Sequence, residues 1–298
     1  MSGRVLDGRD LASHLRRELL HRVDALVGPD PEAPRPRLAI IRQDEHPAAA
    51  LYAASLERAA RAVGVEPTRY AGDGEPLEEV LRRLNQDPIV AGIVVAQPFG
   101  DPVAGRRLVE AIDPAKDVDG ATPTNAGWLA RGEPALVPAT ALAVIAMLEA
   151  HRIEVAGRRA VVVGRSPVVG RPVASLLLAR DATVTVCHRA TRNLARETRR
   201  AEVLVAAAGS PQLIGPEMVA RHAVVIDCGI NAVAGGIVGD VDFAAVAPVC
   251  RAISPVPGGI GPVTPMMVLR QTVENAERLW TERAASPVTE STLAASHS

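Results

Sequence analysis

Aromatic side chains are scarce in this chain, with Phe, Trp and Tyr together making up 2% of its 298 residues. Proteins commonly bind the bases of nucleic acids by stacking them on aromatic rings, so this scarcity argues against a nucleic-acid-binding surface. The charge balance agrees, because the formal net charge is -1 and the arginines are spread along the chain. We therefore expect no nucleic-acid partner.

Cysteine and long apolar runs are lacking too. The three cysteines, Cys187, Cys228 and Cys250, form no CxxC motif or Cys/His cluster, so we interpret them as small buried side chains and predict no metal site. No apolar run approaches the roughly 18 residues that cross a bilayer, and the first residues lack the apolar segment of a signal peptide. We expect a soluble cytoplasmic protein with no membrane partner.

Lysine occurs once, at Lys116, so arginine carries nearly all of the positive charge. We interpret this as a general compositional bias. On a solvated surface arginine replaces lysine readily, but at a chemical site the two are not interchangeable.

Helical and strand patterns alternate through the first half of the chain. They predict a helix over 7–26, a proline-rich loop over 28–36, a strand over 38–41, a helix over 48–63 ended by Gly64, a helix over 77–84 and a strand over 90–95. Strands and helices alternating at this spacing are typical of a parallel α/β sheet.

The same rhythm restarts at residue 159. It predicts strands over 160–164, 183–187, 202–207, 223–228 and near 251–253, with helices over 170–179 and 191–200. Helices over 138–150 and 264–282 flank this unit, the second with Thr264 as N-cap and Pro265 at the first helical position. The predicted fold class is α/β, with two parallel-sheet domains of which the second is Rossmann-like. The tail over 284–298 is predicted to be disordered.

A glycine turn, Gly164-Arg-Ser-Pro-Val-Val-Gly170, joins a buried strand to a helix. This is how a mononucleotide-binding βα unit presents a helix N-terminus to a pyrophosphate. Ser166 stands where GxGxxG has its second glycine, so the spacing alone fits an ordinary βα connection equally well.

The second strand of this unit ends in His188-Arg189, where an NAD site has an acidic residue for the ribose 2′-hydroxyl. A cation suits a 2′-phosphate, so we predict NADP as cofactor, with NAD possible and Arg165 as a second phosphate ligand. The alternative is that Arg189 is an ordinary surface residue.

Two further segments have an unusual composition. Pro257-Gly-Gly-Ile-Gly-Pro262 combines rigid prolines with glycines that lack side chains, which lets a flat ligand lie against the backbone, although it could be a plain connection. Lys116-Asp-Val-Asp-Gly120 could be an ordinary charged turn when taken alone.

Together these motifs resemble the methylenetetrahydrofolate dehydrogenase/cyclohydrolase family, from Leu6-Asp-Gly-Arg9 to about Leu279. The resemblance implies a folate-substrate domain over 1–137 plus 265–283, an NAD(P)-binding domain over 138–264, a cleft between them, a C-terminal helix packed on the first domain, and a homodimer. It implies hydride transfer from 5,10-methylenetetrahydrofolate to the nicotinamide, giving 5,10-methenyltetrahydrofolate. In bifunctional members water then opens the ring to give 10-formyltetrahydrofolate.

The resemblance also implies site residues. On the folate side it implies Tyr52 along the substrate, Asp119 at the pterin ring, and the loop residues Pro257, Gly258 and Gly259. On the cofactor side it implies Gly164, Arg165, Ser166, Gly170, His188, Arg189, Gly209, Asp227, Ile230 and Asn231.

The chain departs from the family at its proton-transfer residues. Leu56 stands where the family has a catalytic lysine, one helical turn from Tyr52. The helping glutamine of the family's Val-Gln-Leu-Pro sequence becomes Ala96, unless a bulge returns Gln97 to the site. The family's second lysine becomes Arg58, and its Pro-Cys-Thr-Pro becomes Pro138-Ala-Thr-Ala141.

A leucine cannot transfer a proton, and the loss of a positioned acid/base group costs about 10²- to 10⁴-fold in rate. We therefore expect a dehydrogenase whose cyclohydrolase activity is weak or lost. The alternatives are a fully bifunctional enzyme in which Gln97, Glu57 or water replaces the lysine, a non-catalytic folate-binding paralogue, and an oxidoreductase for another substrate.

Overall fold

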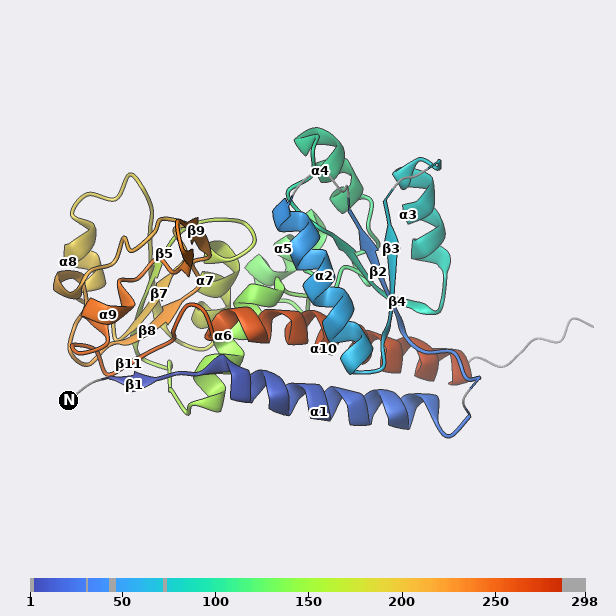
Figure 1. The fold of residues 1–298 in the computed structure, drawn as a ribbon, viewed down its shortest axis with the longest axis horizontal. Coiled ribbons are helices and arrows are strands. Elements are labelled where there is room, and N and C mark those ends of the chain that lie inside the picture. Colours follow the sequence, from blue (N-terminus) through green and yellow to red (C-terminus); the bar gives the residue numbers. More distant parts are fainter. Residues whose placement is uncertain (1–2, 31, 43–46, 72–73, 286–298) are drawn as a thin grey trace, which may run out of the picture.

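Two parallel sheets lie toward opposite ends of the molecule in the computed structural model, which describes residues 3–30, 32–42, 47–71 and 74–285 (Figure 1). The smaller sheet has the order β3-β2-β4, from β2 (Arg37–Ile41), β3 (Glu66–Tyr70) and β4 (Val90–Val95). The predicted tail falls almost wholly outside the described residues.

The larger sheet has six parallel strands in the order β1-β11-β8-β7-β5-β6. They are β1 (Arg4–Val5), β5 (Arg159–Val163), β6 (Thr183–Cys187), β7 (Val203–Ala206), β8 (Val224–Asp227) and β11 (Ala252–Ile253). This confirms the predicted α/β fold class with a Rossmann-like second sheet. Strand β1, from the start of the chain, forms the edge of this second sheet.

Helices cover both sheets. They are α1 (Gly8–Val27), α2 (Pro47–Ala62), α3 (Leu77–Gln86), α4 (Pro102–Glu110), α5 (Pro123–Arg131), α6 (Ala139–Ala150), α7 (Gly170–Leu178), α8 (Leu194–Thr198), α9 (Phe243–Val246) and α10 (Ile260–Ala285), with a 3₁₀ turn at Pro216–Met218. A two-stranded antiparallel hairpin, β9 (Asn231–Val233) and β10 (Gly236–Val238), follows β8. Within the described ranges no helix has the length and apolar character needed to cross a membrane.

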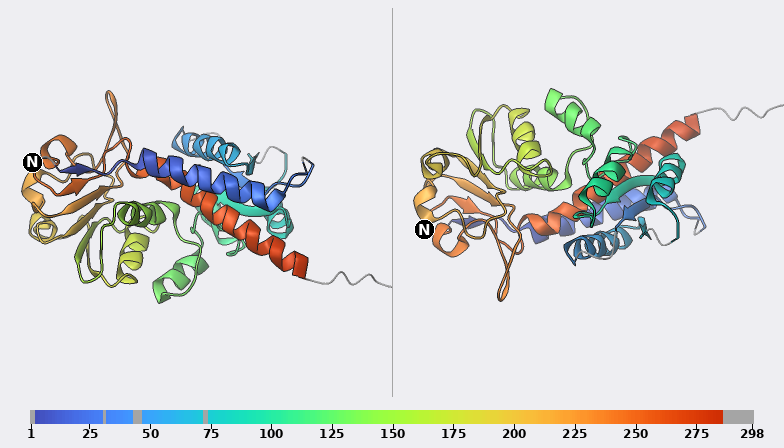
Figure 2. Two further views of the ribbon diagram at one scale, coloured as in Figure 1. Left: turned by 90° about the horizontal axis from the view of Figure 1, so that it is seen from below. Right: turned by 90° about the horizontal axis from the view of Figure 1, so that it is seen from above.

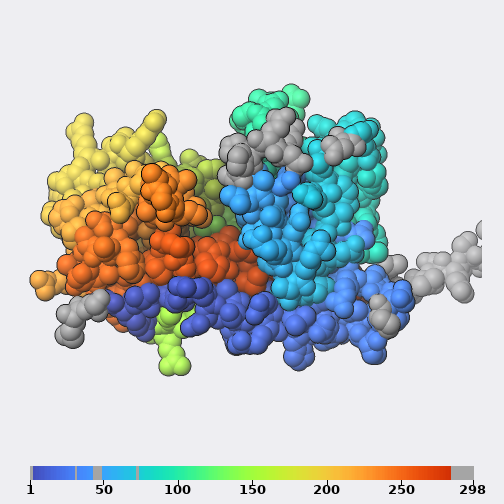
Figure 3. Space-filling view, in the orientation of Figure 1, coloured from blue at the N-terminus to red at the C-terminus, as the bar shows by residue number. Residues whose placement is uncertain are grey.

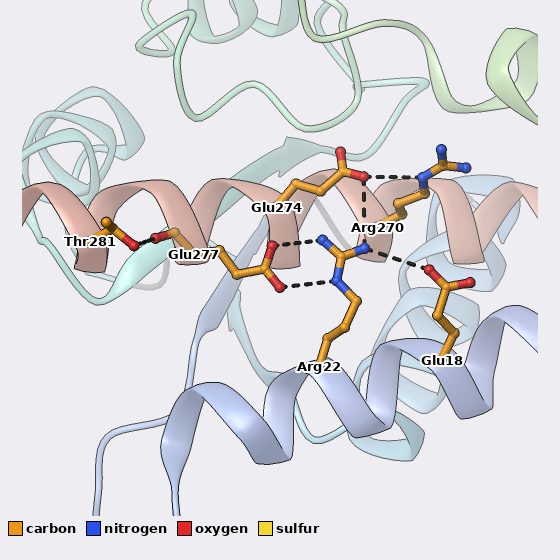
Figure 4. Close-up of polar contacts among 6 residues, drawn as sticks. All are labelled: Glu18, Arg22, Arg270, Glu274, Glu277 and Thr281. Atoms are coloured by element: carbon orange, nitrogen blue, oxygen red, sulfur yellow. Dashed lines mark hydrogen bonds and ion pairs between the residues drawn. The ribbon is translucent and has the colours of Figure 1, made fainter.

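Helices α1 and α10 run side by side from the larger sheet along one side of the smaller sheet (Figures 1 and 2). An ion-pair network ties them together (Figure 4). Arg22 of α1 donates to both carboxylate oxygens of Glu277, at 2.7 and 3.0 Å, and lies 3.7 Å from Glu18 and 3.8 Å from Glu274. Because α1 follows β1 and α10 follows β11, the helix pair links the nucleotide sheet to the smaller sheet.

Close packing of α10 on the smaller sheet depends on a glycine. Every residue of β4 is buried, and a Cβ on Gly92 would lie 2.7 Å from Val118 and 2.9 Å from Thr272 of α10. On the same helix Asn275 donates to the carbonyl oxygens of Ala91 and Ala115, at 2.6 and 2.7 Å. The predicted return of the C-terminal helix onto the first domain is confirmed.

The predicted start of that helix is wrong. Helix α10 begins at Ile260, so Pro265 lies inside it and Thr264 is not the N-cap; the Thr264 hydroxyl instead donates to the Ile260 carbonyl at 3.3 Å. The first turn of a helix tolerates proline because its N–H groups have no intrahelical partner, so Pro262 does not delay the helix. Only the first part of the Pro/Gly-rich segment remains a loop.

The predicted helix over 191–200 is shorter than expected, because Asn193 takes a φ of 53° and its side chain caps α8 by accepting from Arg196 N at 3.2 Å. Several elements were missed: β1, β3, α4, α5 and the β9–β10 hairpin. Strand β3 reads Glu-Pro-Thr-Arg-Tyr and has no apolar run; it lies at a sheet edge, where proline is tolerated.

Candidate active site

The predicted cofactor residues gather at one edge of the larger sheet. Gly164 follows β5, His188 follows β6, Gly209 lies just beyond β7, and Cys228 follows β8. These four strands are neighbours and all parallel, so their carboxyl ends meet at the same edge. Ligands of doubly wound folds bind in the crevice outside this edge.

The turn after β5 is packed as tightly as a phosphate-binding turn. Gly164 has a φ of 134°, and a Cβ there would overlap the carbonyl of Ala207. A Cβ on Gly170 would overlap the carbonyl of Gly164, so α7 begins directly against the turn. Ser166 Oγ accepts from Val169 N at 3.1 Å and from Gly170 N at 3.4 Å, which fixes the entry into the helix.

Two exposed arginines lie at this edge. Arg165 lies within the glycine turn, directly after Gly164, and Arg189 lies in the turn after β6. That turn is held by His188, whose backbone N–H donates to Thr191 Oγ1 at 2.8 Å and whose Nδ1 accepts from Ala190 N at 3.2 Å. Both residues therefore lie at the carboxyl ends of neighbouring strands, β5 and β6.

Asp227 has both carboxylate oxygens engaged inside the protein. They accept from the backbone N–H groups of Gly229, Asp240 and Val241, at 2.8, 3.0 and 2.9 Å. Burial raises the pKa of Asp227 to about 6, although these backbone bonds lower it. Asp227, which is predicted to lie at the cofactor, therefore holds together the loops that follow β8 and β10.

Of the two neighbouring predicted residues, one is bonded inside the protein and the other is exposed. Asn231 Nδ2 donates to Asp240 Oδ1 at 2.9 Å, whereas Ile230 is 70% exposed. Of the two, Ile230 has the side chain that is free to meet a ligand.

On the folate side, Tyr52 of α2 and Asp119 meet. The Tyr52 hydroxyl donates to Asp119 Oδ1 at 3.2 Å. Burial, together with the charge of nearby Asp117, raises the pKa of Asp119 to about 7, and the bond from Tyr52 opposes the rise. Burial, with the charge of Asp119, raises the pKa of Tyr52 well above its usual value. Burial and the nearby carboxylate thus favour the protonated form of Asp119.

Asp119 is positioned by the fully buried Asp117. The Asp117 carboxylate accepts from Ala121 N at 2.9 Å, from Thr122 N at 2.7 Å and from Asn125 Nδ2 at 2.9 Å. The only lysine, Lys116, is buried and donates to the carbonyl oxygens of Leu84 and Asp87, at 2.9 and 2.7 Å. It holds this segment to α3 and is not directed to Asp119.

Gln271 of α10 is a supporting residue that the sequence did not reveal. It is buried, and its Nε2 donates to the carbonyl oxygens of Val118 and Val137, at 2.8 and 3.0 Å, while its Oε1 accepts from Val137 N at 2.8 Å. It joins the Asp119 segment to the segment that leads into α6. A lone glutamine in a helical pattern carries no sequence signal for such a role.

The side chains at the expected lysine position and at the related motif positions are apolar. Leu56 is 0% exposed and belongs to the same hydrophobic cluster as Ala96, Ala139 and Ala141, with Tyr52 packed against it. These residues occupy the positions where the family has its lysine, its glutamine and its Cys-Thr-Pro segment. No proton-carrying side chain stands at these four positions.

Gln97 does not return to the site. It is exposed, its Oε1 accepts from Phe99 N at 3.2 Å within its own loop, and the Gln97–Pro98 bond is cis. A Cβ on Gly105 of α4 would lie 3.3 Å from its Nε2, so the side chain points toward α4. Successive residues of an extended segment face opposite sides, and here Ala96 has the inner side.

The loop with Pro257, Gly258 and Gly259 lies against the start of α1. Gly8 N donates to the Gly258 carbonyl at 2.8 Å, and a Cβ on Gly8 would overlap Gly259 O. Gly258 has a φ of 111°, which a side chain would strain. The space-filling view shows the surface hollowed between the nucleotide-sheet part, yellow to orange, and α2, blue (Figure 3).

Comparison with known proteins gives two consecutive matches. Residues 6–119 match the family model described as tetrahydrofolate dehydrogenase/cyclohydrolase, catalytic domain, and residues 138–280 match its NAD(P)-binding domain. The bifunctional protein FolD of Acidiphilium cryptum is 46% identical over 278 residues, which cover 92% of this chain and 98% of that protein.

Solved structures agree. The bifunctional enzyme FolD from Campylobacter jejuni superimposes with a TM-score of 0.87 at 36% identity, covering 93% of this chain and 99% of that one. The Trypanosoma brucei methylenetetrahydrofolate dehydrogenase-cyclohydrolase, complexed with NADP and an inhibitor, gives a TM-score of 0.86 at 34% identity, covering 93% and 98%.

Proposed function

Because the chain belongs to the tetrahydrofolate dehydrogenase/cyclohydrolase family, we propose that it oxidises 5,10-methylenetetrahydrofolate to 5,10-methenyltetrahydrofolate with NADP, and that its cyclohydrolase activity is weak or lost. The observation that carries the second part is that Leu56, Ala96 and Ala139, where the family has its lysine, its glutamine and a cysteine, all belong to the buried apolar core against which Tyr52 packs. The domain assignment stays a proposal: folate unit 1–137 plus 265–283, cofactor unit 138–264.

Hydride transfer requires little from the protein beyond the positioning of substrate and cofactor. The nicotinamide supplies the hydride acceptor when it is bound, so the side chains have to hold two carbons near contact and keep water away. Asp119 and Tyr52 would hold the pterin side of the substrate, and the Gly164–Gly170 turn would hold the cofactor phosphates. The buried leucine and alanines help to keep this region dry.

Ring opening also requires acid/base groups, since water must be activated and a proton must reach a ring nitrogen. Leu56, Ala96 and Ala139 can do neither. Arg58 is no substitute, because a guanidinium group does not deprotonate near neutral pH. Asp119 has a pKa near neutrality, but in this proposal it is occupied by the pterin.

A second candidate is a fully bifunctional enzyme. The observation that favours it is the name of the similar relatives, among them the FolD protein of Acidiphilium cryptum, which is called bifunctional. In that case an ordered water or Glu57, one residue beyond Leu56, would have to supply the proton.

The preference for NADP is proposed from Arg189 and Arg165, which place two guanidinium groups at the ends of neighbouring strands. A homodimer is proposed from β6, an edge strand of the sheet whose residues Thr183, Thr185 and Val186 are exposed. Edge strands are usually covered by a partner or otherwise protected. Light scattering at micromolar concentration tests this, and a monomer there would rule the dimer out.

Asp119→Ala tests the folate assignment. We expect loss of tetrahydrofolate-dependent reduction of NADP, with binding of NADP unchanged in titration calorimetry, because the residue lies on the substrate side. Asp10→Ala, an exposed residue in the first turn of α1, is the matched control. Turnover that survives Asp119→Ala would contradict the assignment.

A further inference from the structure

Asp240 is a fully buried carboxylate directly after the β9–β10 hairpin, and it holds a loop more than 30 residues away in the chain. Oδ2 accepts from Ala208 N at 2.5 Å and from Gly209 N at 2.9 Å, and Oδ1 accepts from Ser210 N at 2.9 Å. Three consecutive backbone N–H groups therefore converge on one side chain, as they do around a bound anion.

The loop that Asp240 holds follows β7 at the carboxyl edge of the sheet. Its first residue, Ala207, lies against Gly164, where any Cβ would overlap the Ala207 carbonyl. Gly209 has a φ of 62°, and a Cβ placed on it would have no neighbour within 4 Å, so it borders open space. The loop is thus in contact with the Gly164–Gly170 turn and open on its outer side.

Strand order indicates which half of a dinucleotide this loop meets. Arg189 follows β6, on one side of β5, and the loop follows β7, on the other side. A dinucleotide with its 2′-phosphate near Arg189 and its pyrophosphate at Gly164 extends its nicotinamide half toward β7. Asp240 occupies the backbone N–H groups of residues 208–210, so these groups are not free to bind a phosphate.

Asp240 is itself held in place. Asp227 accepts the backbone N–H groups of Asp240 and Val241, at 3.0 and 2.9 Å, and the Asp227 N–H donates to Ser254 Oγ at 2.8 Å. A side chain on Gly239 would collide with Asp227, and one on Gly229 would collide with Asp240. A chain of contacts therefore runs from β8 through the two carboxylates to the loop.

We propose that Asp240 is a positioning residue for the dehydrogenase reaction, which holds the loop over 207–210 against the nicotinamide half of the cofactor. The inference rests on the proposed function. It explains why a carboxylate is buried here with four donors around it: the backbone N–H groups of residues 208–210 and Asn231 Nδ2.

Asp240→Asn tests the proposal, because the amide keeps the shape but turns one acceptor into a donor that faces backbone N–H groups. We expect the Kd for NADP, measured by calorimetry, to rise about tenfold or more. The Kd for 2′-phospho-ADP-ribose, which lacks the nicotinamide, should stay within about twofold of the wild-type value, because the Gly164–Gly170 turn is held by its own bonds to Ser166 Oγ and not by Asp240. Melting temperature and folate affinity are measured alongside.

Asp242→Asn is the matched control, since Asp242 lies two residues on and caps α9 by accepting from Ala245 N at 3.1 Å. It should leave both cofactor affinities unchanged. If Asp240→Asn does not fold, Gly209→Ala strains the same loop through its positive φ and should give the same split between NADP and 2′-phospho-ADP-ribose.

Equal weakening of both ligands, or of neither, in the folded variants would overturn the role of Asp240. Failure of the wild-type protein to bind NADP would instead overturn the proposed function, so the two failures are distinguishable.

Discussion

Leu56→Lys is the substitution from which we expect the largest gain in cyclohydrolase activity. Leu56 is fully buried on the face of α2 that carries Tyr52, one turn away, and Tyr52 is bonded to Asp119. A lysine there brings an amine toward this pair, and burial lowers the pKa of an amine into the range of a general base. A positioned acid/base group contributes about 10²- to 10⁴-fold, so hydrolysis of 5,10-methenyltetrahydrofolate should rise by about 10²-fold or more.

The substitution also has a stability cost. Loss of the buried leucine removes about 2 kcal/mol of hydrophobic stabilisation, and partial desolvation of the amine adds to this, for a total of about 3–5 kcal/mol. A domain with ordinary stability of about 5–15 kcal/mol tolerates that amount. Urea unfolding should show the loss, and it also verifies that the assayed protein is folded.

The assay follows the absorbance of the methenyl substrate in a buffer where spontaneous hydrolysis is slow. Leu56→Met is the matched control, because it fills the same space without a titratable group. Leu56→Lys combined with Ala96→Gln should be faster still. A folded Leu56→Lys variant that hydrolyses no faster than Leu56→Met would refute the reasoning that position 56 limits ring opening.

Two other predictions concern the charged groups. Arg189→Ser should raise KM for NADP about tenfold or more and leave KM for NAD within about twofold, since it removes a charge-assisted contact to the 2′-phosphate; equal effects on both would contradict this. Folding raises the pKa of Asp119 from its usual 3.8 to about 7, so its contribution to stability is full below about pH 4 and is lost as the pH rises through 7. Relative to Asp119→Asn, the wild-type free energy of unfolding should fall by up to about 4 kcal/mol over that range, and parallel curves would show that the carboxyl titrates normally.

Elements with a strong apolar period could be predicted from the sequence, and polar or short ones could not. Strand β4 and helix α1 could be predicted nearly to the residue. Every residue of β4 is buried, and the buried side chains Leu15, Leu19 and Val23 of α1 recur every four residues. Strand β3 and the β9–β10 hairpin were missed, since their residues are largely exposed and show no such period. Tertiary pairing determines such elements more than local preference does.

In the candidate site, too, some residues could be predicted from the sequence and others could not. The family resemblance assigns both Tyr52 and Asp119 to the substrate, but the hydrogen bond between them appears only in the structure. The strand-end glycines follow from the fold. The supporting residues Asp240 and Gln271 act through bonds to backbone groups far away in the chain. No local pattern marks such a residue, because any buried polar side chain can find partners once the fold has formed.

The most direct test of the central claim is a time course with purified wild-type protein, 5,10-methylenetetrahydrofolate and NADP, in which reduced cofactor and methenyl product are recorded separately while spontaneous hydrolysis is slow. We expect methenyl product to accumulate in step with reduced NADP. Reduced NADP without accumulation of methenyl product would show that ring opening proceeds without a lysine at position 56, and would contradict the proposed loss of cyclohydrolase activity.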